Sequence, residues 1–136
     1  MRVAVALHDL GKISDGFRAM IETGTPQRFR HWQLTEALLF AHDDRLAERI
    51  GGSWRQRQAL YASVAGHHGQ PSDLALGQPG QPDKDMRAAL AAVGSGLRPA
   101  AEAIDAFCAL WPGTSLAALA AGKATTALGW WLPGLC

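Results

Sequence analysis

Alanine and leucine dominate the stretches of this chain between its glycine- and proline-rich breaks. The runs of β-branched residues that mark strands are missing, so the sequence favours helices throughout. We therefore predict an all-α fold. The 136 residues, 48% of them hydrophobic, suffice for one compact domain and are too few for two ordinary ones. A single domain spanning residues 1–136 is expected.

Capping residues and glycines divide the chain into helices. Ser14 and Ser53 are typical N-caps, and Gly24 is a typical stop. The longest periodic segment predicts a central packing helix, while the polar, Pro/Gly-rich stretch at residues 70–85 predicts a mobile loop. The predicted helices cover Arg2–Leu10, residues 15–23, Gln33–Ile50, residues 54–65, Lys84–Val93, Pro99–Trp111, Ser115–Ala121 and Lys123–Leu132.

Net charge, apolar runs and cysteine usage indicate which partners and which cellular compartment suit the chain. The formal net charge is +1, so an anionic partner must be bound locally and not by a general positive field. No apolar run approaches the roughly 18 residues that span a bilayer, and the apolar end at Ala127–Cys136 predicts core packing. Cys108 and Cys136 lack CxxC spacing and accompany no signal peptide. We expect reduced thiols, a cytoplasmic location and no membrane partner.

Four of the five histidines stand in short motifs that suit metal binding. His8 lies in "HDLGK", His31 in "RHW", and His67 and His68 in "GHHG". A neutral imidazole is a ligand for Mn, Fe, Co, Ni or Zn, and the carboxylate of Asp9 could bridge two such ions. Two cations roughly 3.5–4 Å apart activate a water and clamp the oxygens of a phosphodiester. The pattern therefore predicts hydrolysis of phosphate esters.

Lys12 follows Asp9 by three positions, so a continuing helical turn would place its ammonium beside the ligands to hold a scissile phosphate. Structural interpretations remain open. Lys12 can bind carbonyls at a helix end, and His31 can pack on Trp32 or cap a helix. Adjacent helical residues point about 100° apart, so one histidine of "GHHG" can be a ligand and the other only its support.

Two further groups are interpreted as non-catalytic. His42 and Asp43 form a second His-Asp pair, but they lie within the predicted helix Gln33–Ile50 among charged residues, which predicts a solvated face. Trp54, Arg55 and Arg57 could bind a nucleic-acid strand by stacking and phosphate contact. Arginines that follow an N-cap more often face water, which is the interpretation we favour.

The ordered set "HDLGKISDGFR", "FRHW" and "GHHGQP" resembles the HD nuclease domain of the CRISPR-associated nuclease-helicase of type I interference systems. The resemblance covers nearly the whole chain. HDxGK alone is shared across the HD phosphohydrolase superfamily, and its combination with "KISDGF" and "GHHG" is more specific. The resemblance implies an HD-domain helical bundle of about six to eight helices and a nuclease activity that depends on divalent ions such as Mn, Ni, Co, Fe or Mg, ideally two.

The resemblance also implies roles for particular residues. His8 would bind one metal, Asp9 would bridge both and act in catalysis with Lys12, and His31, His67 and His68 would serve the second metal. A family histidine upstream of His8 and a family aspartate beyond Cys136 have no counterpart. We therefore expect a fragment cropped at both ends, with an incomplete site for the first metal.

The implied function is cutting of single-stranded DNA in antiviral defence. The implied partners are an RNA-guided surveillance complex that exposes the strand and a helicase domain or subunit that feeds it. The chain has no GxxxxGK[ST] phosphate loop, so no helicase domain is expected here. Two alternatives remain open: a general HD phosphohydrolase acting on nucleotides, and a catalytically impaired HD fold that serves as a binding module.

Overall fold

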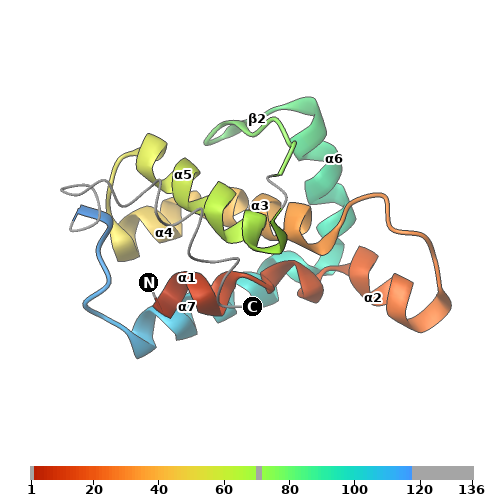
Figure 1. The fold of residues 1–136 in the computed structure, drawn as a ribbon, viewed down its shortest axis with the longest axis horizontal. Helices are drawn as coiled ribbons and strands as arrows, with labels where there is room; N and C mark the ends of the chain where they lie inside the picture. The colour runs from red at the N-terminus through yellow and green to blue at the C-terminus, as the bar shows by residue number, and fades with distance from the viewer. Residues whose placement is uncertain (1, 70–71, 118–136) are drawn as a thin grey trace.

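The computed structural model describes residues 2–69 and 72–117 and confirms the all-α prediction for them (Figure 1). A single antiparallel pair of two-residue strands, with Gly77 opposite Pro82, is the β-structure of this part of the chain. The elements are α1 (Arg2–Leu7), the 3₁₀ helix η1 (Leu10–Ile13), α2 (Asp15–Thr23), α3 (His31–Ala41), α4 (Asp43–Ile50), α5 (Trp54–Ala65), the 3₁₀ helix η2 (Gly66–His68), β1 (Gly77–Gln78), β2 (Gln81–Pro82), α6 (Lys84–Val93), the 3₁₀ helix η3 (Gly94–Gly96) and α7 (Leu97–Leu110).

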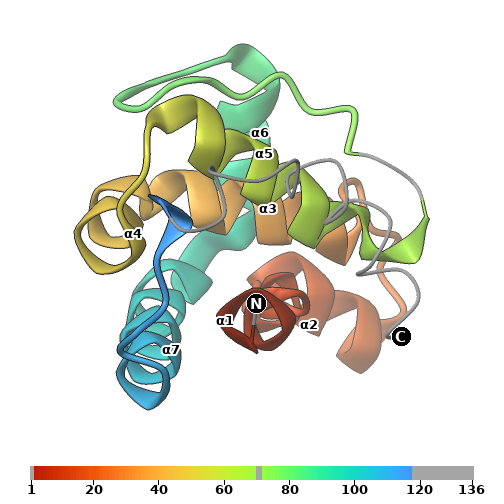
Figure 2. The same cartoon turned by 60° about the vertical axis from the view of Figure 1, so that its left-hand side comes forward.

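Helix α3 is the central element. Every residue from Leu34 to Phe40 is buried, because η1, α5 and α6 all pack against this helix. In both views α1 and α7 lie beneath α3 and α5 (Figures 1 and 2). A helix buried on several sides needs apolar residues around its circumference, and the sequence "LTEALLF" largely supplies them. The position of α3 fixes where its first residue, His31, can lie.

The predicted helix caps are confirmed. Ser14 Oγ accepts a hydrogen bond from the Phe17 backbone N–H, and Gly24 ends α2 in the left-handed conformation. Ser53 and Gln56 form a capping box at the start of α5. Helix α6 has the predicted bounds, and α7 begins two residues before the predicted start at Pro99.

Several predictions lie beyond the described residues. The predicted helix Ser115–Ala121 is described only to residue 117, where residues 116 and 117 are helical. The helix predicted at Lys123–Leu132 lies outside the described residues, and so does the apolar end at Ala127–Cys136. Cys108 is buried with a free thiol. No helix in residues 2–69 or 72–117 has the length and apolar character needed to cross a bilayer.

The first predicted helix is too long by three residues, because Gly11 packs directly against α3. Helix α1 ends at Leu7, and the chain turns before η1. The Gly11 N–H donates to Thr35 Oγ1 (2.8 Å), and the Thr35 hydroxyl donates to the His8 carbonyl (3.2 Å). A Cβ at Gly11 would lie 1.9 Å from the His31 carbonyl oxygen. The turn therefore lets the chain approach the first turn of α3.

This close approach makes a testable prediction. Gly11→Ala should lower the free energy of unfolding by about 1–3 kcal/mol, since the backbone of α3 must shift to admit the methyl group. Denaturant unfolding followed by circular dichroism measures the change. Gly113→Ala is the matched control, because a Cβ there meets nothing within 4 Å. Equal stability of the two variants would contradict the packing described here.

The prediction of one helix over Gln33–Ile50, with His42 and Asp43 on a solvated face, is wrong. The helix is interrupted at His42, whose imidazole donates to the Leu97 carbonyl (Nε2 to O, 2.9 Å). Asp43 is buried and accepts hydrogen bonds from Arg57 and from the Tyr61 hydroxyl. The break turns Asp43 toward α5, where a cationic partner can offset the cost of its burial.

The interpretation of Arg57 as facing water is wrong for the same reason. Arg57 is buried against Asp43, and Trp54 packs edge-on against Phe40 and Tyr61 of the core. Arg55 alone of this trio is exposed. The possible strand-binding edge formed by Trp54, Arg55 and Arg57 is therefore absent.

Glu36 is a buried acid in the middle of α3, only 3% exposed. Burial raises its pKa, the hydrogen bond with Ser72 lowers it, and the charge of Asp73 raises it, so that the net shift is upward. A carboxyl whose pKa is raised by folding contributes stability that is complete below its unfolded pKa. That contribution is lost as the pH rises through the folded pKa.

Glu36→Gln should therefore raise Tm relative to the unmodified chain at pH 8, because the amide cannot ionise. The advantage should shrink as the pH falls toward 4, where Glu36 itself becomes neutral. Thermal unfolding of both proteins across this pH range measures the difference. If the difference in Tm between the two proteins were the same at every pH, Glu36 would not titrate within the fold.

Candidate metal centre

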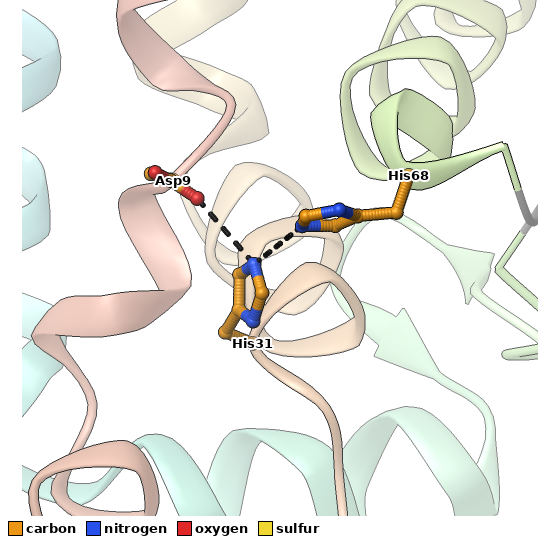
Figure 3. Close-up of side chains that lie close together, drawn as sticks. All are labelled: Asp9, His31 and His68. Atoms are coloured by element: carbon orange, nitrogen blue, oxygen red, sulfur yellow. Dashed lines mark hydrogen bonds and ion pairs between the residues drawn. The ribbon is translucent and has the colours of Figure 1, made fainter. Parts of the chain in front are cut away.

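Three side chains from distant parts of the sequence converge at one point (Figure 3). Asp9 precedes η1, His31 is the first residue of α3, and His68 is the last residue of η2. One ligand atom from each lies within 4.8 Å of the other two. His31 Nε2 is 3.4 Å from Asp9 Oδ1 and 2.9 Å from His68 Nε2. The fold thus brings together three of the residues singled out in the sequence.

Contacts of α3 position these groups. The packing of Gly11 on Thr35 places the Asp9 segment beside the start of α3. The Gln33 side chain accepts from the Arg30 N–H (2.8 Å), which defines that start, and donates to Asp73 Oδ1 (2.7 Å). Since Asp73 follows η2 closely in the chain, this bond ties the histidine-bearing segment to α3. Helix α5, which leads into η2, packs on α3 as well.

The surroundings of Asp9 keep it ionised. Lys12 Nζ lies 2.6 Å from Oδ2, where His8 Nε2 also approaches to 3.4 Å. Burial alone raises the pKa of Asp9, but the hydrogen bond from Lys12 and the charges of His8, Lys12 and His31 outweigh it and hold the pKa below its usual value. A carboxylate that is deprotonated at neutral pH is the form that binds a cation.

His8 lies beside the cluster of Asp9, His31 and His68. Its Nδ1 donates a hydrogen bond to the Val5 carbonyl, because a carbonyl oxygen can only accept. Nε2 is the nitrogen that approaches Asp9. A backbone carbonyl that fixes the tautomer of an imidazole is the usual support of a metal-binding histidine.

Two predicted site residues keep their roles as predictions. The backbone of His67 lies in η2, and its side chain is outside the described part of the structure. Lys12 lies where the sequence placed it, next to Asp9, although in a 3₁₀ turn and not in a continuing α-helix. Its side chain is 46% exposed, so its ammonium is open to an anionic ligand.

The donor set fits a divalent transition metal. One carboxylate oxygen and two imidazole nitrogens suit Mn, Fe, Co, Ni and Zn, whereas Mg prefers oxygen donors alone. The two oxygens of Asp9 face different imidazoles, Oδ1 toward His31 and Oδ2 toward His8. A carboxylate placed in this way can serve one ion on each side.

Sequence reasoning missed one group near the centre. The Phe17 ring lies 5.8 Å from the His31 ring, edge to face. Phe17 belongs to the segment "KISDGF" that carries the family resemblance, but nothing in that segment predicts that its ring would lie beside His31. Trp32 does pack on His31, at 5.4 Å, as the structural interpretation of His31 predicted. That packing coexists with the convergence of His31 on Asp9 and His68.

Comparison with known proteins identifies the family. The chain matches the family model described as "Cas3, HD domain" over residues 1–136. It belongs to the Cas3 HD domain family. The resemblance seen in the sequence motifs is thereby confirmed, and the helical architecture agrees with it. Neither the curated proteins nor the solved structures gave a match. Because HD domains bind divalent metals, Asp9, His31 and His68 form the candidate metal centre of this Cas3 HD domain.

Proposed function

We propose that this Cas3 HD domain hydrolyses phosphodiester bonds of single-stranded DNA with the help of divalent metal ions. The observation that carries the proposal is the convergence of Asp9, His31 and His68, whose ligand atoms lie within 4.8 Å of one another. Membership of a nuclease family supports the reaction type. Single-stranded DNA is the substrate that the sequence resemblance implies.

The residues have distinct tasks in this proposal. Asp9, His31 and His68 would hold a cation, His67 would add to that site, and His8 would hold a second cation together with Asp9. Divalent cations held by these residues would supply an activated water and would stabilise the charge that develops on the phosphate.

Lys12 is a positioning group for the substrate. Its ammonium now pairs with Asp9 Oδ2 at 2.6 Å. If Asp9 were occupied by a cation, the Lys12 ammonium would turn from Asp9 to a phosphate oxygen of the strand. Since Lys12 is half-exposed, this movement needs no change in the packing of the fold.

The wider setting also belongs to the proposal. The domain acts in cytoplasmic antiviral defence, a surveillance complex exposes the target strand, and a helicase domain or subunit delivers it. The slight positive charge of the chain suits a strand that is delivered and not captured over a large basic surface.

A substrate panel tests the proposal. Labelled single-stranded DNA, duplex DNA, nucleotides and cyclic dinucleotides are incubated with Mn²⁺, Ni²⁺, Co²⁺ or Mg²⁺, and the products are separated. Metal-dependent cleavage of the single strand is expected. Preferential hydrolysis of the nucleotides would favour the general phosphohydrolase, and strand binding without turnover under every metal would favour the binding module. Either result contradicts the proposal.

His42→Ala provides the internal control for the panel. His42 belongs to the second His-Asp pair of the chain, but its imidazole binds the Leu97 carbonyl. Its removal should leave cleavage unchanged, whereas His67→Ala should abolish it. Equal loss of cleavage in both variants would refute the assignment of the histidines.

A further inference from the structure

Two aromatic rings lie against the imidazoles of the candidate metal centre. Phe17 of α2 meets His31 edge to face, with ring centroids 5.8 Å apart. Trp32 meets His31 in the same manner at 5.4 Å and lies at a tilt to His68 at 5.3 Å. Both rings are half-buried, so part of each faces solvent next to the metal ligands.

Within the described part of the chain, neither ring belongs to the hydrophobic core or packs against it. The other aromatic residues that the structure describes lie in the hydrophobic core or pack against it: Phe29, Phe40, Trp54, Tyr61, Phe107 and Trp111. Phe17 and Trp32 are absent from that set, and α2 contains no buried residue. Large aromatic side chains normally stabilise a fold by being buried in it. The two exceptions in residues 2–69 and 72–117 are the two beside the candidate ligands.

Exposed basic residues stand next to these rings along the chain and could contact a polyanion. Lys12 lies at Asp9, Arg18 follows Phe17, and Arg30 precedes His31; all three are exposed. Positive side chains interleaved with aromatic rings are the arrangement that binds single-stranded nucleic acid, because phosphates meet the cations and bases stack on the rings. The chain as a whole is nearly neutral, so this local charge is what a strand would meet.

We propose that Phe17 and Trp32 are stacking surfaces for nucleobases of the strand whose phosphodiester lies at Asp9, His31 and His68. The inference rests on the proposed function and adds the groups that position the substrate. Stacking on an aromatic ring tolerates any base, so these residues confer a requirement for bases and not for a sequence. The competing explanation is that both rings only brace the imidazoles.

DNA binding measured without metal ions, so that no metal-dependent cleavage occurs, distinguishes base stacking from bracing of the imidazoles. Fluorescence anisotropy measures the affinity of a labelled oligothymidylate of about twelve nucleotides, and of an abasic strand of equal length, with metals removed by EDTA. Phe17→Leu and Trp32→Leu should each weaken oligothymidylate binding by about fivefold or more and leave abasic binding unchanged. Phe17→Tyr and Trp32→Phe should restore the affinity, since an aromatic face returns.

The matched control is Leu110→Ala, which removes an apolar side chain that is 65% exposed on α7. It should change neither affinity. Unchanged oligothymidylate binding in both leucine variants would overturn the inference. An equal loss for the abasic strand would do so too, because a bracing role or general misfolding does not depend on bases.

The outcomes also separate this inference from the proposed function. Base-dependent binding that needs Phe17 and Trp32 in a chain that never cleaves would sustain the inference and refute the nuclease. Cleavage of single-stranded DNA with normal KM in both leucine variants would sustain the nuclease and refute the inference. Calorimetric titration of Mn²⁺ adds a readout for bracing: stacking leaves the metal affinity of both variants unchanged, and bracing lowers it.

Discussion

Asp9→Ala is expected to lower metal-dependent cleavage of single-stranded DNA by about a thousandfold or more, which corresponds to about 4 kcal/mol of activation free energy. Asp9 is the carboxylate of the candidate centre, and its two oxygens face His31 and His8. Its loss removes the partner of Lys12 and the carboxylate that we propose is shared by two cations. Initial rates at saturating Mn²⁺ measure the effect.

Asp9→Asn separates charge from shape, because the amide keeps the size of the side chain but cannot neutralise a cation. It should be nearly as inactive as the alanine variant. Asp85→Ala removes an exposed carboxylate in the first turn of α6 and should retain full activity. Substantial cleavage by Asp9→Asn at ordinary metal concentrations would contradict the role assigned to the carboxylate.

Arg57→Ala is expected to lower the free energy of unfolding by about 3–5 kcal/mol, because it leaves the buried Asp43 carboxylate without its cation. Arg57 donates through Nε to Asp43 Oδ1 (2.7 Å), through Nη2 to Oδ2 (2.8 Å) and through Nη1 to the Gly52 carbonyl (2.6 Å). The hydrogen bond to Asp43 raises the pKa of Arg57, so the guanidinium stays charged. A fall in Tm of more than about 10 °C should follow.

Arg55→Ala is the matched control for this loss, since Arg55 is exposed on the same helix. Its effect should remain within about 0.5 kcal/mol. Replacing the whole pair, as in Asp43→Leu with Arg57→Met, should recover much of the stability that Arg57→Ala loses, because no buried charge is left over. Similar stability of the two single arginine variants would contradict the burial of this ion pair.

Local signals explain which parts of the fold the sequence could predict. Ser14, Ser53 and Gly24 act within one helical turn of their own positions, so their cap roles are readable without tertiary knowledge. The boundaries at Leu7 and His42 depend on distant groups. Gly11 must clear the backbone of α3, and Asp43 needs Arg57 of the next helix. No local pattern carries that information.

The candidate site shows the same division. Asp9 and His68 could be singled out because each stands beside a histidine, and His31 because "FRHW" is part of the set that carries the family resemblance. Nothing local could reveal that the Phe17 ring would lie against His31, since that contact depends on how α2 meets the start of α3. The prediction that His42 and Asp43 lie on a solvated face is wrong because a charged sequence is compatible both with an exposed helix and with a helix that contributes to a buried ion pair.

Calorimetric titration of Mn²⁺ into the metal-free chain tests the convergence of the three ligands most directly. Asp9→Ala, His31→Ala and His68→Ala should each weaken binding by about ten- to a hundredfold or more, while His42→Ala should bind as the unmodified chain does. Such a result places ligands from three distant segments on one ion. Unchanged Mn²⁺ affinity in His31→Ala and His68→Ala would contradict the account.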